Sequence, residues 1–122
     1  MTIYAAVLAS AIQILGCPEV VEGKQTINAP PAEWSVRFPY TKHNLSEVDV
    51  YSGPPNEMRL LIGSDLKSGA TQWSSTGREM WVECKYSHSA AVLRRNLGVV
   101  RRCTFTPTPQ LTTDPAKFIC IK

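Results

Sequence analysis

Hydrophobic and polar residues alternate with a period of two along much of this chain. The segment Glu79–Tyr86 is the clearest case, because Met80, Val82 and Cys84 alternate with residues that are mostly charged. Such a period places successive side chains on opposite faces of a strand, so one face is apolar and the other polar. After Cys17, no longer stretch keeps the i, i+3, i+4, i+7 apolar spacing of an amphipathic helix. The pattern predicts an all-β, mainly antiparallel domain.

Short runs of β-branched and aromatic residues, closed by Gly, Pro, Asn or Ser, recur along the chain as they do in all-β domains. The predicted strands are Glu19–Glu22, Trp34–Phe38, Glu47–Tyr51, Met58–Ile62, Thr71–Ser75, Glu79–Tyr86, Ala91–Arg95, Val99–Phe105 and Lys117–Ile121. Gly53–Asn56 contains two consecutive prolines and predicts a turn, because proline lacks the N–H that a strand ladder needs. Asn96–Gly98 predicts a hairpin connection, with Gly98 free to take a positive φ. We expect a small sandwich-like or open-barrel domain.

The N-terminal residues 1–16 differ from the rest of the chain. They are apolar and carry no charge, and the sequence becomes polar after Gly16. The run is shorter than the roughly 20 residues of a membrane span and is typical of a secretory signal, with a small-x-small cleavage pattern at Ala9–Ala11. No Lys or Arg precedes it, which departs from that pattern, and a buried N-terminal helix or strand is the alternative. We expect a signal-like segment over residues 1–16 and one β-rich domain over residues 17–122.

The chain has four cysteines, Cys17, Cys84, Cys103 and Cys120, and no C-x-x-C pair. Even parity, together with the export signal, predicts two disulfides in an oxidising compartment. Residues Ile14–Cys17 also resemble a lipobox, but lipidation of Cys17 would leave an odd set of three cysteines. Three pairings are open to four cysteines. We expect Cys103–Cys120, between the last two strands, and Cys17–Cys84, which would attach the N-terminal segment to a central strand.

Length and charge set further bounds. The 122 residues, 43% hydrophobic and 19% charged, have room for a single domain with one core. The net charge of +3 is mild, and basic and acidic residues are mixed along the chain. The doublets Arg94-Arg95 and Arg101-Arg102 point to opposite faces of their strands, so they predict no nucleic-acid interface. We expect the mature chain not to insert into a membrane.

No catalytic or metal-binding pattern is apparent. His43 and His88 are the two histidines, and neither lies in an H-E-x-x-H, H-x-E or C-x-x-C setting. Composition predicts His43 in a loop and His88 in a polar surface turn. Glu47 and Asp49 share a strand face, which suits acid–base chemistry but is also typical of a solvated face. The sequence therefore predicts a binding protein that is not an enzyme and uses no cofactor or metal.

Large aromatic residues among polar neighbours are typical anchors of protein interfaces. We expect Trp73 and Trp81 on solvent-facing strand positions, Tyr51 beside the predicted turn, Tyr40 in a loop, and Arg78 as a charged contact. The alternative for each aromatic residue is that it covers the core.

Several segments resemble a family of small exported proteins from Gram-negative, largely enterobacterial genomes. They are Cys17–Val21, Trp34–Val36, His43–Leu45, Val48–Pro55 and Arg78–Tyr86. Proteins of this kind lie near type VI secretion effector genes. The resemblance implies a periplasmic immunity protein that binds and sterically inhibits a cognate secreted toxin, with peptidoglycan as the expected target of that toxin. A periplasmic envelope-associated binding module and a small hydrolase with an unrecognised site are the alternatives.

A first prediction concerns processing. Mature protein isolated from its host should begin after Ala11 or nearby, with Cys17 unlipidated, because the apolar run is typical of a cleaved signal. Intact-mass analysis measures both properties. A retained Met1, or a diacylglycerol adduct on Cys17, would contradict this interpretation.

Overall fold

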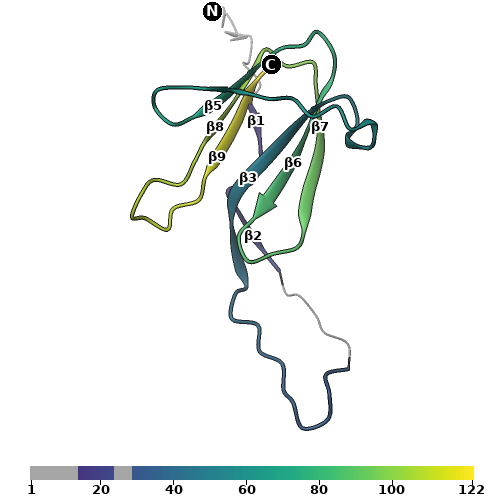
Figure 1. Ribbon diagram of the computed structural model, residues 1–122, viewed down its shortest axis with the longest axis vertical. Helices are drawn as coiled ribbons and strands as arrows, with labels where there is room; N and C mark the ends of the chain where they lie inside the picture. The colour runs from purple at the N-terminus through teal and green to yellow at the C-terminus, as the bar shows by residue number, and fades with distance from the viewer. Residues whose placement is uncertain (1–13, 24–28) are drawn as a thin grey trace, which may run out of the picture.

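The computed structural model describes residues 14–23 and 29–122, which form two antiparallel sheets (Figure 1). The five-stranded sheet has the order β1–β9–β8–β5–β4, with β1 Ile14–Gly16, β9 Lys117–Ile121, β8 Arg102–Thr106, β5 Thr71–Ser74 and β4 Ser64–Asp65. The four-stranded sheet has the order β2–β3–β6–β7, with β2 Val20–Glu22, β3 Lys42–Ser52, β6 Met80–Tyr86 and β7 Val92–Gly98. A 3-10 turn, η1 Pro55–Glu57, follows β3. The all-β, antiparallel fold class is confirmed.

The core lies between the inner faces of the two sheets. The four-stranded sheet contributes Val50 and Val82, and the five-stranded sheet contributes Trp73, Cys103 and Phe118. The rings of Trp73 and Phe118 meet edge to face at 6.0 Å, an arrangement that aromatic pairs favour. In β6 every second side chain is buried, as its alternating sequence predicts. Figure 1 shows β5, β8 and β9 on one side of this core and β3, β6 and β7 on the other.

Two disulfides use all four cysteines, in the expected pairings. Cys103 and Cys120 are direct cross-strand partners on β8 and β9. Cys17 lies where the chain crosses from β1 in one sheet to β2 in the other, and its bridge reaches Cys84 on β6. One bridge therefore fastens the two strands at the centre of the five-stranded sheet, and the second joins the crossing segment to the four-stranded sheet.

Strand β1 includes residues at the end of the apolar N-terminal run. Ile14–Gly16 pairs with β9, so the folded part of the chain extends N-terminally beyond Cys17. A side chain at Gly16 would collide with the carbonyl oxygen of Phe118, and only glycine permits this close approach. The expected cleavage site at Ala9–Ala11 lies outside the described residues. No helix in residues 14–23 and 29–122 is long and apolar enough to cross a membrane.

Two predicted strands are wrong. Residues Trp34–Phe38 form no strand and lie in a loop, where the Trp34 N–H donates to the Pro31 carbonyl at 3.1 Å. These residues have β propensity but no neighbouring strand to pair with, and prolines at both ends of the loop lack the backbone N–H donors that a strand ladder needs. Met58–Ile62 forms no strand: Met58 takes a left-handed φ of 56° at the end of η1, and Leu60 makes only an isolated bridge to Tyr51.

The predicted hairpin at Asn96–Gly98 is also wrong. These residues are the end of β7, and the chain then crosses to β8 in the other sheet. Gly98 does take the expected positive φ, of 71°. The β8 strand begins at Arg102 instead of Val99, because residues 99–101 make the crossing, with Val99 exposed and Val100 buried. The turn predicted at Gly53–Asn56 is confirmed, with Gly53 at φ 82°.

We expect the disulfides to dominate stability. In the chain-entropy estimate, the bridge with a sequence separation of 17 contributes about 3 kcal/mol and the bridge with a separation of 67 about 4 kcal/mol. Paired Cys→Ser variants, C103S/C120S and C17S/C84S, should lose these amounts in urea-induced unfolding followed by tryptophan fluorescence. Thiol titration of the denatured, unreduced wild type should find no free thiol, and four reactive thiols would refute the assignment.

Candidate partner-binding surface

The outer face of the four-stranded sheet carries a row of large side chains. Tyr51 on β3 is the cross-strand partner of Trp81 on β6, and Trp81 in turn lies opposite Asn96 on β7. On the other side of Tyr51, the isolated bridge places Leu60 beside it. Directly paired residues project on the same face of a sheet, so these side chains form one continuous row. Val50 and Ser52, the neighbours of Tyr51 in β3, are buried, which places Tyr51 and its row on the solvent side.

Hydrogen bonds hold Trp81 in place. Its indole Nε1–H donates to Glu79 Oε1 at 3.2 Å, and the Asn96 amide donates to the other oxygen, Oε2, at 2.9 Å. Two donors stabilise the carboxylate, and for that reason the pKa of Glu79 is lowered. The Asn96 carbonyl oxygen also accepts the Gly98 N–H at 2.8 Å. These hydrogen bonds fix the orientation of the Trp81 ring.

Ion pairs lie beside the aromatic row on the same face. Lys85 Nζ is 2.7 Å from Asp49 Oδ2, and this hydrogen-bonded carboxylate raises the pKa of Lys85. Arg94 is 3.1 Å from Glu83. Glu83 also accepts a hydrogen bond from the Tyr51 hydroxyl, and this bond is the main cause of the raised pKa of Tyr51. The outer face thus combines an aromatic centre with mixed, locally neutralised charge.

The predicted contact residues do not all lie together. Tyr51 and Trp81 are adjacent, and Arg78 lies close to Gly53, at the same end of the sheet. Tyr40 is in another region, stacked on His88. The solvent-facing placement of Trp73 is wrong, because its side chain is 8% exposed and its indole N–H donates to the Leu61 carbonyl at 3.3 Å. The strand of Trp73 has polar residues on both faces, so its pattern did not indicate which face is buried.

Sequence reasoning missed an apolar stripe beside the aromatic row. Met58, Leu60 and Ile62 are all exposed, Ile62 at 95%, whereas Leu61 between them packs against the core. A signal for this was present, because Leu60, Leu61 and Ile62 are consecutive. In an extended segment only one of two faces can pack against the core, so consecutive apolar residues leave one face exposed. Exposed apolar side chains next to aromatic ones enlarge the candidate binding surface.

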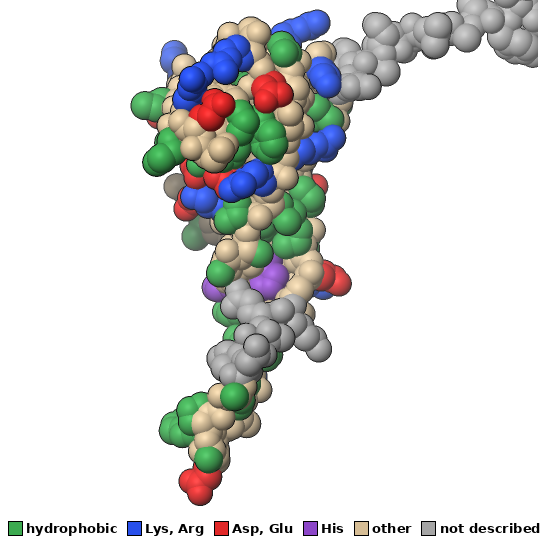
Figure 2. All heavy atoms as spheres, turned by 90° about the vertical axis from the view of Figure 1, so that its right-hand side faces the viewer, with side chains coloured by type: hydrophobic (Ala, Val, Ile, Leu, Met, Phe, Trp, Pro, Cys, Tyr) green, Lys and Arg blue, Asp and Glu red, His purple; other side chains and the backbone are tan. Residues whose placement is uncertain are grey.

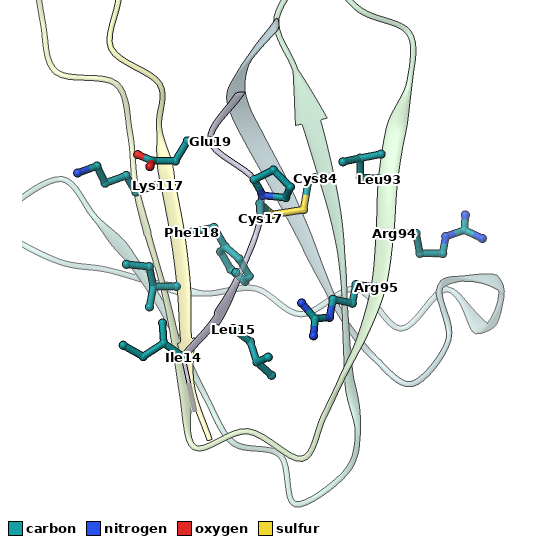
Figure 3. Close-up of a pocket in the computed structure, with 13 residues that line it drawn as sticks. Ile14, Leu15, Cys17, Glu19, Cys84, Leu93, Arg94, Arg95, Lys117 and Phe118 are labelled. Carbon is teal, nitrogen blue, oxygen red and sulfur yellow. A yellow bond between two sulfur atoms is a disulfide. The ribbon is translucent and has the colours of Figure 1, made fainter. Parts of the chain in front are cut away.

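A separate groove of about 730 Å³ lies between the sheets, near β1 and β7 (Figure 3). Figure 3 shows Phe118, Leu15 and the Cys17–Cys84 bridge on its apolar wall, with Arg95 reaching in from β7. Glu19 is the one carboxylate among the residues that line it, and no histidine, serine or threonine is among them. The lining offers apolar surface and positive charge, and no paired acid and base.

The profile of the family described as Type VI secretion system Tli immunity protein matches residues 40–121. The chain belongs to this family. No curated protein and no solved structure matches the chain significantly. The resemblance to type VI immunity proteins found in the sequence is therefore confirmed.

The family match divides this Tli-family chain into two parts. Strands β3 to β9 lie within the matched residues, and with them the whole aromatic row and its ion pairs. Strands β1 and β2, Cys17 and the loop residues 29–39 lie outside it. The candidate binding face belongs to the part that this chain shares with the Tli family.

The hydrogen bond between Tyr51 and Glu83 gives a pH prediction. Replacing Glu83 by Gln should lower the pKa of Tyr51 toward its ordinary value of 10.0, because the accepting carboxylate is lost. The folded-state pKa is raised, so this bond stabilises the fold below about pH 10 and its contribution is lost as the pH rises through the folded-state pKa.

Tyrosine titration by NMR with ring-carbon labelling measures this shift. Tyr86 is the internal control, because burial raises its pKa and Glu83 plays no part in that shift. An unchanged pKa of Tyr51 in the Glu83→Gln variant, or an equal pKa shift of Tyr51 and Tyr86, would contradict the assigned cause.

Proposed function

We propose that this Tli-family protein binds its cognate effector through the outer face of the four-stranded sheet and inhibits it by steric occlusion. The observation that carries the proposal is the Leu60–Tyr51–Trp81 row, which is continuous and lies on the solvent side of the sheet, with Leu60 exposed and the two aromatic residues half-buried, within the family-matched residues. Large aromatic side chains dominate the energetics of most protein interfaces. Trp81 is also held by Glu79, so little side-chain entropy is lost when it binds.

The charges beside this row suit recognition of a protein partner. Asp49, Lys85, Glu83 and Arg94 place both signs within the same few strands. Such a mixed rim selects a partner with the complementary pattern and accelerates encounter at low salt. Because each carboxylate here is paired with a cation, the face is better suited to contact than to proton transfer. We therefore propose inhibition without catalysis by this chain.

We further propose that the protein acts in the periplasm. Two disulfides suit an oxidising compartment, and the apolar N-terminal run suits export. Occlusion does not depend on the chemistry of the effector, so the proposal holds whether or not the target is peptidoglycan, which remains a prediction. An envelope-associated binding module of another ligand is the alternative function.

The test is binding to the effector encoded by the adjacent gene, measured by calorimetry with purified proteins. Tyr51→Ala and Trp81→Ala should each weaken binding by about 30-fold, the effect of losing an interface anchor worth about 2 kcal/mol. Leu111→Ala is the matched control, because Leu111 is fully exposed on a different loop and should leave affinity unchanged.

The same variants should protect poorly when co-expressed with the effector in the periplasm. Each loses a hydrogen bond and some stability, so circular dichroism at the assay temperature is needed to show that the variants are still folded. Wild-type protein that neither binds nor protects against the neighbouring effector would refute the immunity function and favour the envelope module. Full binding by the Tyr51→Ala/Trp81→Ala double variant would refute the outer face as the contact surface.

A further inference from the structure

A long loop projects from the sheets between β2 and β3, and its described part spans residues 29–41. Figure 1 shows it extending below both sheets, and Figure 2 shows it as a narrow stalk with histidine side chains, in purple, where it joins the body. Trp34 lies on this loop with 74% of its surface exposed. Burial of apolar surface is favourable by about 25 cal/mol per Å², so an exposed indole gains free energy when a partner covers it. Such a residue is a candidate for contact with a partner.

The base of the loop is fixed to the domain by several contacts. The Gly23 N–H donates to the Thr41 carbonyl at 3.0 Å, which closes the loop across its base. Below this closure His43 is 4% exposed, with Nδ1 3.0 Å from the Ser87 carbonyl and Nε2 3.2 Å from the Gly23 carbonyl. The expectation that His43 lies in a loop is therefore wrong: it is a buried residue of β3 that connects the loop base to the β6–β7 turn.

A second contact supports the same base. The ring of Tyr40 stacks on His88 with centroids 3.7 Å apart and planes 3° from parallel. His88 lies in the β6–β7 turn at a φ of 56°, where the sequence predicted a polar turn. Tyr40, one of the expected partner contacts, thus has one ring face occupied within its own chain. These aromatic and histidine contacts hold the exit of the loop against the sheet.

The loop itself is restricted as well. Pro30, Pro31 and Pro39 fix φ at three positions, and the bond from the Trp34 N–H to the Pro31 carbonyl closes a turn directly before the indole. Glu33, within that turn, takes a φ of 73°, which is uncommon for a residue with a side chain. A loop that is already ordered loses less conformational entropy when it binds. The indole is presented on a restricted support and touches little of its own domain.

We propose that this loop inserts into a concave, apolar cleft of the effector, with Trp34 as its anchor. A projecting side chain is buried on several sides only by a concave partner surface, and the main concavity of an enzyme is in most cases its substrate cleft. The inference rests on the proposed function and adds a second contact to the outer sheet face. Residues 29–39 lie outside the family match, which suits a role in distinguishing one effector from related ones.

The experiment uses full-length protein and the effector encoded by the adjacent gene. Trp34→Ala should weaken binding by at least about 30-fold, with thermal unfolding unchanged because the indole is exposed. Leu111→Ala is again the matched control, an exposed apolar residue on the β8–β9 loop that should bind like wild type. Oxidative footprinting by mass spectrometry should show Trp34 oxidised in the free protein and protected in the complex.

The outcomes separate this inference from the proposed function. Wild-type affinity of Trp34→Ala, or Trp34 still oxidised in the complex, would overturn loop insertion, whereas weakened binding by Tyr51→Ala and Trp81→Ala would leave the outer face in place. A photo-crosslinking residue in place of Trp34 should attach to the wall of an effector cleft, and attachment to a flat or convex surface would overturn the inference. If wild-type protein binds no neighbouring effector, both proposals fail.

Discussion

The Cys17–Cys84 bridge connects the two sheets at the point where the chain passes from one to the other. The crossing segment has little secondary structure of its own, since β1 and β2 are three residues each. Held to the middle of β6, it keeps β1 beside β9 and β2 beside β3. Strand β2 in turn supports Gly23, and through it the base of the projecting loop. The groove, the edge pairing and the loop all depend on this one covalent link.

The two proposed contact regions are built differently. The outer face is a rigid surface, because its residues lie on paired strands and are joined by cross-strand hydrogen bonds and ion pairs. The loop is narrow and depends on its base, where buried His43 and stacked Tyr40 replace the neighbours that a strand would have. A broad face supplies contact area, whereas a narrow projection reaches a recess. Together they would give an inhibitor both affinity and selectivity.

The sequence predicted the elements whose signals are local. The alternation in Glu79–Tyr86 and the prolines after Gly53 each specify one conformation, and both predictions are confirmed. The errors arise where a residue's environment depends on distant chain. Trp34–Phe38 has strand propensity and no partner, and Trp73 has polar neighbours but packs against Phe118, which lies 45 positions later in the chain. His43 resembles a loop residue until β2 and the β6–β7 turn enclose it. Tyr51 and Trp81 could be named from sequence, but their adjacency depends on the β3–β6 register.

The pairing of β1 with β9 has a consequence for biogenesis. A chain that is exported N-terminus first delivers β1 long before its partner, and β9 emerges last. Before β9 emerges, Cys17 can form its disulfide with Cys84. Strand β1 has no strand to pair with, and Cys103 has no Cys120 with which to form a disulfide. The domain can therefore close only after nearly the whole chain has emerged. A chain stalled or truncated before Lys117 would leave its first strand unpaired and one cysteine free to react with another molecule.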